Sequence, residues 1–155
     1  MKQEIPLFVE KLWGREEIIK NHDLYCGKIL HFQGPTKLED EIHPINGAHI
    51  PGQLVTFRSS IHYHKLKTET FYCVDGFVVL NFHTGHQSES MLEIPTRQIF
   101  MHPGDGVTID PMEIHSFFAT KPSRIIEFST QDFREDSIKL QLSKMIILEN
   151  LQDFK

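Results

Sequence analysis

Residues 62–76 read HYHKLKTETFYCVDG, and this stretch decides how the whole chain is interpreted. His62 and His64 are two positions apart, and in a β-strand that spacing places both imidazoles on one face, as two ligands of one metal ion require. Glu69 begins the next apolar run, where its carboxylate shares a face with apolar residues at alternate positions. We therefore predict neighbouring strands that together carry three metal ligands.

A second stretch, HPGDGVTIDPMEIHSF at 102–117, supplies a fourth ligand, His115, shortly after a proline turn. Three imidazoles and one carboxylate suit several transition metals and leave one or two coordination positions for water or substrate. Ligand type alone does not choose among these metals. We predict that one divalent transition metal (Mn, Fe, Co, Ni or Zn) is bound by His62, His64, Glu69 and His115.

Short apolar or alternating runs continue on both sides of these stretches, separated by turn residues. The runs lie at 24–32, 53–64, 68–74, 77–83, 91–94, 97–102, 106–109, 114–120 and 124–130. Strands of this length and spacing favour an antiparallel sandwich or barrel. Asp75-Gly76 between two of the runs predicts a tight hairpin, because a type I′ turn requires positive φ at both central residues.

Helix is expected only near the ends of the chain. Residues 14–20 could form a turn or two, and the tail from about 136 to 152 has apolar residues near helical spacing. The stretch 34–52 is polar, rich in proline and glycine, and not periodic, and a loop of that length is usually functional or mobile. It contains His43 and His49, either of which could approach the metal site.

The chain has 155 residues and a composition typical of one globular domain. We expect a single domain over 1–155, with a barrel core at about 24–130 and a C-terminal tail at 131–155. A net charge of −5, with lysines and arginines spread along the chain, argues against nucleic acid as a partner. Without an apolar run of about 20 residues or a secretory signal, we expect a cytoplasmic protein with no membrane partner. Cys26 and Cys73 lie in apolar runs and are expected to be buried, reduced thiols.

The stretches 62–76 and 102–117 resemble the first and second motifs of the cupin superfamily. The resemblance implies an all-β, double-stranded β-helix (a jelly-roll barrel), to which we add a short N-terminal segment and a C-terminal helix. The chain departs from the motifs at Thr56, Asp110 and Met112, where glycine, proline and glycine are typical. The alternative is a degenerate barrel in which the four ligand side chains form hydrogen bonds and bind no metal.

Three further stretches are similar to those of small cupins related to D-lyxose isomerase and mannose-6-phosphate isomerase. They are VEKLWGREEII (9–19), LYCGKIL (24–30) and RIIEFSTQDFREDS (124–137). The similarity implies a metal-dependent sugar isomerase or epimerase whose small-molecule substrate is a sugar or sugar phosphate. The alternatives are an iron-dependent dioxygenase or lyase, and a non-catalytic cupin that binds a metal or a carbohydrate.

Two residues are candidates for catalysis. Glu127 is an isolated acid among apolar neighbours, so burial should raise its pKa and fit it to act as a base. It could equally be the ion-pair partner of a lysine or arginine on an adjacent strand. Lys28 could contact a sugar hydroxyl or phosphate, although such a residue more often extends outward into solvent.

We also expect a homodimer. Tyr72, Val74 and Phe118 are predicted on the outer faces of strands, where side chains this apolar favour burial against a second copy. The tail 136–152 is expected to pack on the neighbouring barrel in that dimer.

Overall fold

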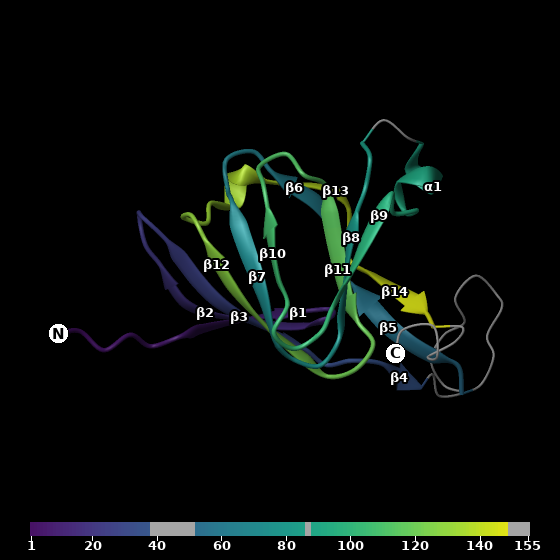
Figure 1. The fold of residues 1–155 in the computed structure, drawn as a ribbon, viewed down its shortest axis with the longest axis horizontal. Helices are drawn as coiled ribbons and strands as arrows, with labels where there is room; N and C mark the ends of the chain where they lie inside the picture. The colour runs from purple at the N-terminus through teal and green to yellow at the C-terminus, as the bar shows by residue number, and fades with distance from the viewer. Residues whose placement is uncertain (38–51, 86–87, 149–155) are drawn as a thin grey trace.

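The computed structural model describes residues 1–37, 52–85 and 88–148, and these residues form three antiparallel β-sheets (Figure 1). The first sheet has the order β1 (Leu7–Lys11), β2 (Gly14–Asn21), β3 (Cys26–Phe32), β12 (Ser123–Ser129), β7 (Glu69–Asp75), β10 (Gly106–Ile109). The second has the order β13 (Ser137–Gln141), β6 (Ile61–His64), β11 (His115–Ala119), β8 (Val78–Phe82), β9 (Arg97–Met101). The third has the order β14 (Lys144–Ile147), β5 (Leu54–Arg58), β4 (Thr36–Lys37). The short helices are α1 (Glu89–Leu92) and the 3₁₀ turn η1 (Arg134–Asp136).

The two larger sheets face each other and enclose the main hydrophobic core (Figure 1). Alternate residues of β3 are fully buried, and those of β12 follow the same period, so each strand turns one face to the core. Leu30, Phe71 and Ile125 of the first sheet belong to one buried cluster with Leu80 and Phe117 of the second. This arrangement confirms the predicted all-β barrel built from two layers.

The Asp75-Gly76 turn joins the two layers, so the predicted hairpin is wrong. It connects β7 of the first sheet to β8 of the second, and those strands do not pair. Gly76 has a φ of 86°, whereas Asp75 lies outside the positive-φ region that a type I′ turn needs. A Cβ at Gly76 would lie 2.0 Å from the Ser123 side-chain oxygen, so the chain can cross here only with glycine.

Both helices predicted near the ends of the chain are strands. Residues 14–20 lie within β2, which pairs with β1 and β3. The described part of the tail forms β13 and β14, which pair with β6 and β5 of the same chain. Open edges of two sheets were available to these segments, and pairing there satisfies more backbone groups than a short isolated helix would. The tail from 137 to 148 therefore packs on its own barrel.

Phe118 lies on the outer face of the second sheet, as predicted, but it is only 5% exposed and so is not available for burial against a second copy. It belongs to a second buried cluster with Phe77, Val79 and Leu148, formed where the third sheet covers the outer face of the second. Tyr72 is 42% exposed on the outer face of β7, as expected.

Cys26 and Cys73 are free and buried, as predicted. No helix among the described residues is long and apolar enough to span a membrane. His43 and His49, together with most of the predicted loop 34–52, lie outside the described residues.

Candidate metal centre

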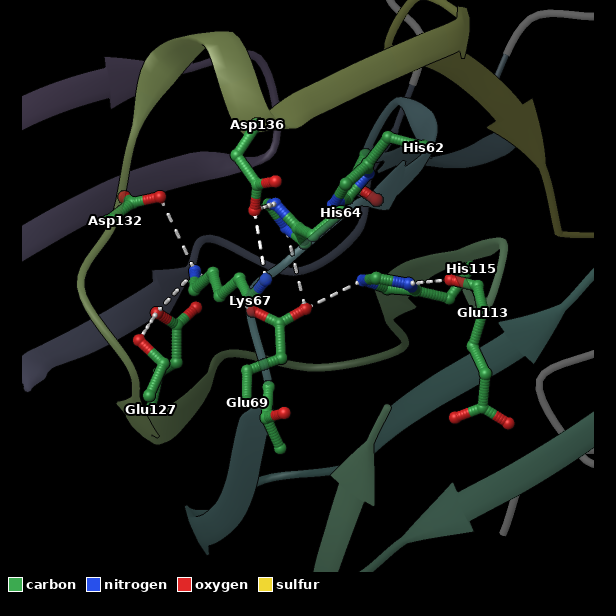
Figure 2. A network of polar contacts seen from close by, with 12 residues as sticks. His62, His64, Lys67, Glu69, Glu113, His115, Glu127, Asp132 and Asp136 are labelled. Atoms are coloured by element: carbon green, nitrogen blue, oxygen red, sulfur yellow. Dashed lines mark hydrogen bonds and ion pairs between the residues drawn. The ribbon is translucent and has the colours of Figure 1, made fainter. Parts of the chain in front are cut away.

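The four predicted ligands come together in one cluster (Figure 2). His62 and His64 lie on β6, Glu69 begins β7, and His115 begins β11. The strands β6 and β11 are neighbours, with His115 directly opposite His62. One ligand atom from each of the four residues lies within 4.8 Å of all the others. Side chains from both sheets thus form one cluster that could hold a metal ion.

Backbone carbonyls orient two of the imidazoles. Nδ1 of His62 lies 3.0 Å from the Ser60 carbonyl oxygen, and Nδ1 of His115 lies 2.9 Å from the Glu113 carbonyl oxygen. Because a carbonyl only accepts hydrogen bonds, each Nδ1 carries the proton and each Nε2 is left with a free lone pair. In this tautomer the hydrogen bond from Nδ1 orients the ring, and Nε2 is available to bind a metal.

The orphaned atoms of the cluster fit a cation. Nε2 of His115 lies 2.9 Å from Oε1 of Glu69, yet neither buried atom has a hydrogen-bond partner. Both are acceptors when His115 is protonated on Nδ1, so their close approach is unfavourable unless a positive charge lies between or beside them. Nε2 of His64 is also directed at Glu69, at 3.7 Å from the same oxygen. The residues present therefore fit a divalent metal better than a purely hydrogen-bonded network.

The protonation states agree with metal binding. Burial lowers the pKa of His62 to about 3. Burial also lowers the pKa of His64. Burial opposes ionisation of Glu69, but its polar contacts, among them the Lys67 ammonium group 3.0 Å away, bring its pKa well below the usual value. Neutral imidazoles and an ionised carboxylate are the forms that bind a metal.

The departure from the second motif at Met112 leaves the ligands in place. Met112 has a φ of 71°, the only non-glycine residue with positive φ in the described chain, at a position where the motif typically has glycine. Its backbone N–H donates a 2.7 Å hydrogen bond to the His64 carbonyl oxygen, which ties the turn to the ligand strand. The left-handed conformation costs a residue with a Cβ about 1–2 kcal/mol. The turn therefore keeps the backbone conformation typical of glycine, although a residue with a Cβ disfavours it.

The cluster forms part of the wall of a cavity of about 820 Å³ inside the barrel. Aromatic side chains line another part of the wall. The Phe117 ring packs edge to face with both Trp13 and Phe71. Trp13 reaches the cavity from the turn between β1 and β2, where a Cβ on Gly14 would lie 1.8 Å from the His31 carbonyl oxygen. The cavity volume is typical of small-molecule sites.

A chain of buried charges extends from the metal cluster along the cavity (Figure 2). Nζ of Lys67 lies 3.0 Å from Oε2 of Glu69 and 3.0 Å from Oε2 of Glu127. Lys28 is 4% exposed, and its Nζ lies 4.0 Å from Glu127 and forms an ion pair with Asp132. Lys28 therefore points into the cavity rather than outward into solvent. Glu127 lines the cavity and also forms an ion pair with Lys67, so the pocket-facing position and the ion pair that its sequence context allowed occur together.

Burial raises the pKa of Glu127 to about 7, and the charge of Glu69 acts in the same direction, whereas Lys67 and Lys28 oppose the shift. A carboxyl group with such a pKa can both accept and return a proton near neutral pH. The burial and the raised pKa of Glu127 are as predicted, and its role as a base stays a prediction.

Sequence reasoning missed two residues of this site, Lys67 and Asp136. Lys67 lies two positions before Glu69, and that spacing is a signal that it can share the face of the ligand strand. Asp136 accepts hydrogen bonds from the backbone N–H groups of Leu66 and Lys67, at 2.8 and 3.0 Å, and so holds the loop that presents Lys67. Asp136 lies 70 residues from that loop, and no local pattern marks its role.

No protein-family model matches the chain, and no curated protein matches it in sequence. Solved structures do share the fold. KdgF from Halomonas sp. has a TM-score of 0.52 at 12% identity, over 78% of this chain and 81% of that one. Pac13 from Streptomyces, described as a nucleoside dehydratase, has a TM-score of 0.61 at 9% identity over 92% of both chains.

The capsular polysaccharide assembling protein CapF from Staphylococcus aureus has a TM-score of 0.61 at 15% identity. The alignment covers 89% of this chain but 35% of CapF, so this chain spans about a third of that protein. At such identities the likeness establishes the fold alone, and the observed sheets agree with a cupin-type barrel fold.

Proposed function

We propose that the protein is a metal-dependent sugar isomerase or epimerase in which Glu127 moves the proton. One observation carries the proposal: Glu127 and the metal cluster line the same cavity and are joined through Lys67, which lies 3.0 Å from both Glu127 and the ligand Glu69. Interconversion of an aldose and a ketose requires a proton to leave one carbon and return to its neighbour. It also requires stabilisation of the negative charge that develops on the adjacent oxygens.

The chain's own residues can perform the proton steps. Ionised Glu127 accepts a proton from the carbon beside the carbonyl group and then returns it to the adjacent carbon, while the hydroxyl proton of the enediolate moves from one of its two oxygens to the other. Lys67 carries a positive charge at the same place, where it favours the ionised form of Glu127 and the enediolate oxygens. The aromatic wall formed by Trp13 and Phe117 suits the apolar face of a sugar and excludes water. A divalent metal bound by His62, His64, Glu69 and His115 would supply Lewis acidity toward the substrate oxygens.

The names of two structural neighbours support a substrate that contains a sugar. Pac13 is described as a nucleoside dehydratase and has been solved with uridine, and CapF is described as a capsular polysaccharide assembling protein. Both descriptions involve carbohydrate, and we extend that substrate class to this chain on the strength of its cavity.

Deuterium exchange tests the proposal without knowledge of the best substrate. Metal-loaded protein is incubated in deuterated water with a panel of pentoses, hexoses and their phosphates, and exchange at C2 is followed by NMR. Glu127→Gln should bind the metal normally while exchange falls by about two to four orders of magnitude. Glu17→Gln is the matched control, because Glu17 pairs with His31 away from the cavity and should exchange as the wild type does.

The outcomes separate the alternatives. Undiminished exchange in Glu127→Gln would remove this residue from the mechanism. Exchange accompanied by loss of water would indicate a lyase. Saturable sugar binding without exchange in the wild type would favour a binding module.

We also propose that the protein is a homodimer that associates through the outer face of the first sheet. Tyr72 and Phe128 are 42% and 57% exposed on the adjacent strands β7 and β12. Their burial against a second copy would remove a substantial apolar surface from water.

A further inference from the structure

The cations that line the cavity fall into two groups. Lys28 and Lys67 are buried, and each forms ion pairs with carboxylates of the cavity. Lys11 lies 3.8 Å from Glu16. Within the described part of the chain, by contrast, Arg134 and Lys139 line the same cavity without a side-chain hydrogen bond or ion pair. Two positive charges at this site are therefore uncompensated by the protein.

The fold places these two cations at the rim on the metal side. Lys139 lies directly opposite His62 in the antiparallel pair of β13 with β6. Opposite residues of such a pair project from the same face of the sheet, so Lys139 shares the face of a metal ligand. Arg134 belongs to η1, immediately before β13. Both residues are exposed, whereas the metal ligands below them are buried or half-buried.

The distribution of charge in the cavity tells where an anion can bind. The interior carries the carboxylates of Glu16, Glu127 and Asp132, which neutralise the buried lysines and would repel a further negative group. Asp136, the buried acid of η1, already accepts hydrogen bonds from two backbone N–H groups, those of Leu66 and Lys67. Among the described residues that line the cavity, the cations of the rim are thus the ones without a carboxylate partner.

We propose that Arg134 and Lys139 bind an anionic group at the far end of the substrate, so that the substrate is a sugar that carries a phosphoryl or carboxylate group. This proposal rests on the proposed function, because it names the substrate class of the same cavity. A guanidinium fork and an ammonium group are the side chains that recognise phosphate and carboxylate oxygens. With its anion held at the rim, the substrate's neutral, carbonyl-bearing end extends toward the metal cluster and Glu127.

Calorimetric titration of the metal-loaded protein tests this assignment. The probes are glucose 6-phosphate, glucuronate and glucose, which differ in the group at C6. The wild type should bind at least one anionic probe about tenfold or more tightly than glucose, and added salt should weaken only the anionic probes. Arg134→Gln and Lys139→Gln should each reduce the affinity for that anionic probe by about tenfold and leave glucose unchanged.

Lys121→Gln is the matched control, because it removes the same charge from an exposed lysine that lies outside the cavity. It should bind all three probes as the wild type does. A preference for glucose 6-phosphate or for glucuronate identifies the anion. Equal affinities in the wild type and an Arg134→Gln/Lys139→Gln double variant, or no binding of either anionic probe, would overturn the proposal. Turnover is not measured, so failure of the exchange experiment and failure of this one are distinguishable.

Discussion

Divalent metal should raise the unfolding temperature of the wild type, and His64→Ala should abolish most of that response. The structure sets the scale of the effect. Oε1 of Glu69 and Nε2 of His115 are buried acceptors without a partner, and each such atom costs about 1–3 kcal/mol. A bound ion would remove this cost. At a free concentration of about one hundred times Kd, the ion would stabilise the folded state by about 2.7 kcal/mol.

That free energy converts to a rise in unfolding temperature of about 5–10 °C, since domains of this size shift by about 2–4 °C per kcal/mol. The assay is thermal unfolding of chelator-treated protein, followed by circular dichroism, before and after addition of Mn²⁺, Co²⁺, Ni²⁺, Zn²⁺ or anaerobic Fe²⁺. Elemental analysis of the same samples gives the metal stoichiometry. The ion with the largest shift also identifies the preferred metal of the cluster.

The control for His64→Ala is His102→Ala, because His102 is an exposed histidine outside the cluster. This control should keep the full shift and one bound metal. Equal shifts in His64→Ala and the wild type, or unchanged stoichiometry in His64→Ala, would show that the metal binds elsewhere. The absence of a shift in the wild type with any of the five ions would refute the reasoning from the orphaned acceptors.

Gly76→Ala should lower the free energy of unfolding by about 3 kcal/mol or more, because the added Cβ would collide with Ser123. The control is Gly104→Ala, where φ is also positive (96°) but a Cβ would have nothing within 4 Å; it should cost only about 1 kcal/mol. Both values are measured by chemical denaturation. The exchange rate at C2 should rise with pH through about 7, because Glu127 acts as a base only when ionised and its pKa is raised to about 7. The residual exchange rate of Glu127→Gln should not show this rise. Light scattering at tens of micromolar should report a dimer for the wild type and a larger monomer fraction for Tyr72→Lys; a wild-type monomer would contradict the proposed assembly.

The strand content and the four clustered side chains could be predicted from the sequence because both depend on short-range patterns. A period of two assigns His62 and His64 to one face, and Glu69 follows within the next strand. His115 was found through the resemblance of its surrounding motif and the turn before it. The structure brings these four residues together as expected.

The pairing of distant strands was decided only in the tertiary structure. Asp75-Gly76 has the composition of a hairpin, but β8 pairs with β11 and β9 rather than with β7. Residues 137–147 carry apolar side chains at spacings compatible with a helix, yet they form two strands. In both cases the strand pairs with a neighbour that is present only in the assembled sheets, and a local sequence pattern carries no information about that neighbour.

The same limit applies to the charges of the cavity. Lys67 contacts Glu127 across 60 residues of sequence, and Asp136 holds the loop that presents Lys67 across 69 residues. Arg134 and Lys139 reach the cavity because β13 pairs with the ligand strand β6. The sequence by itself determined which side chains can bind a metal, since that depends on their chemistry, on the spacing of His62 and His64 along one strand, and on the motifs that contain Glu69 and His115. Which acids and cations surround the metal site depends on contacts between distant strands, and only the folded barrel decides those.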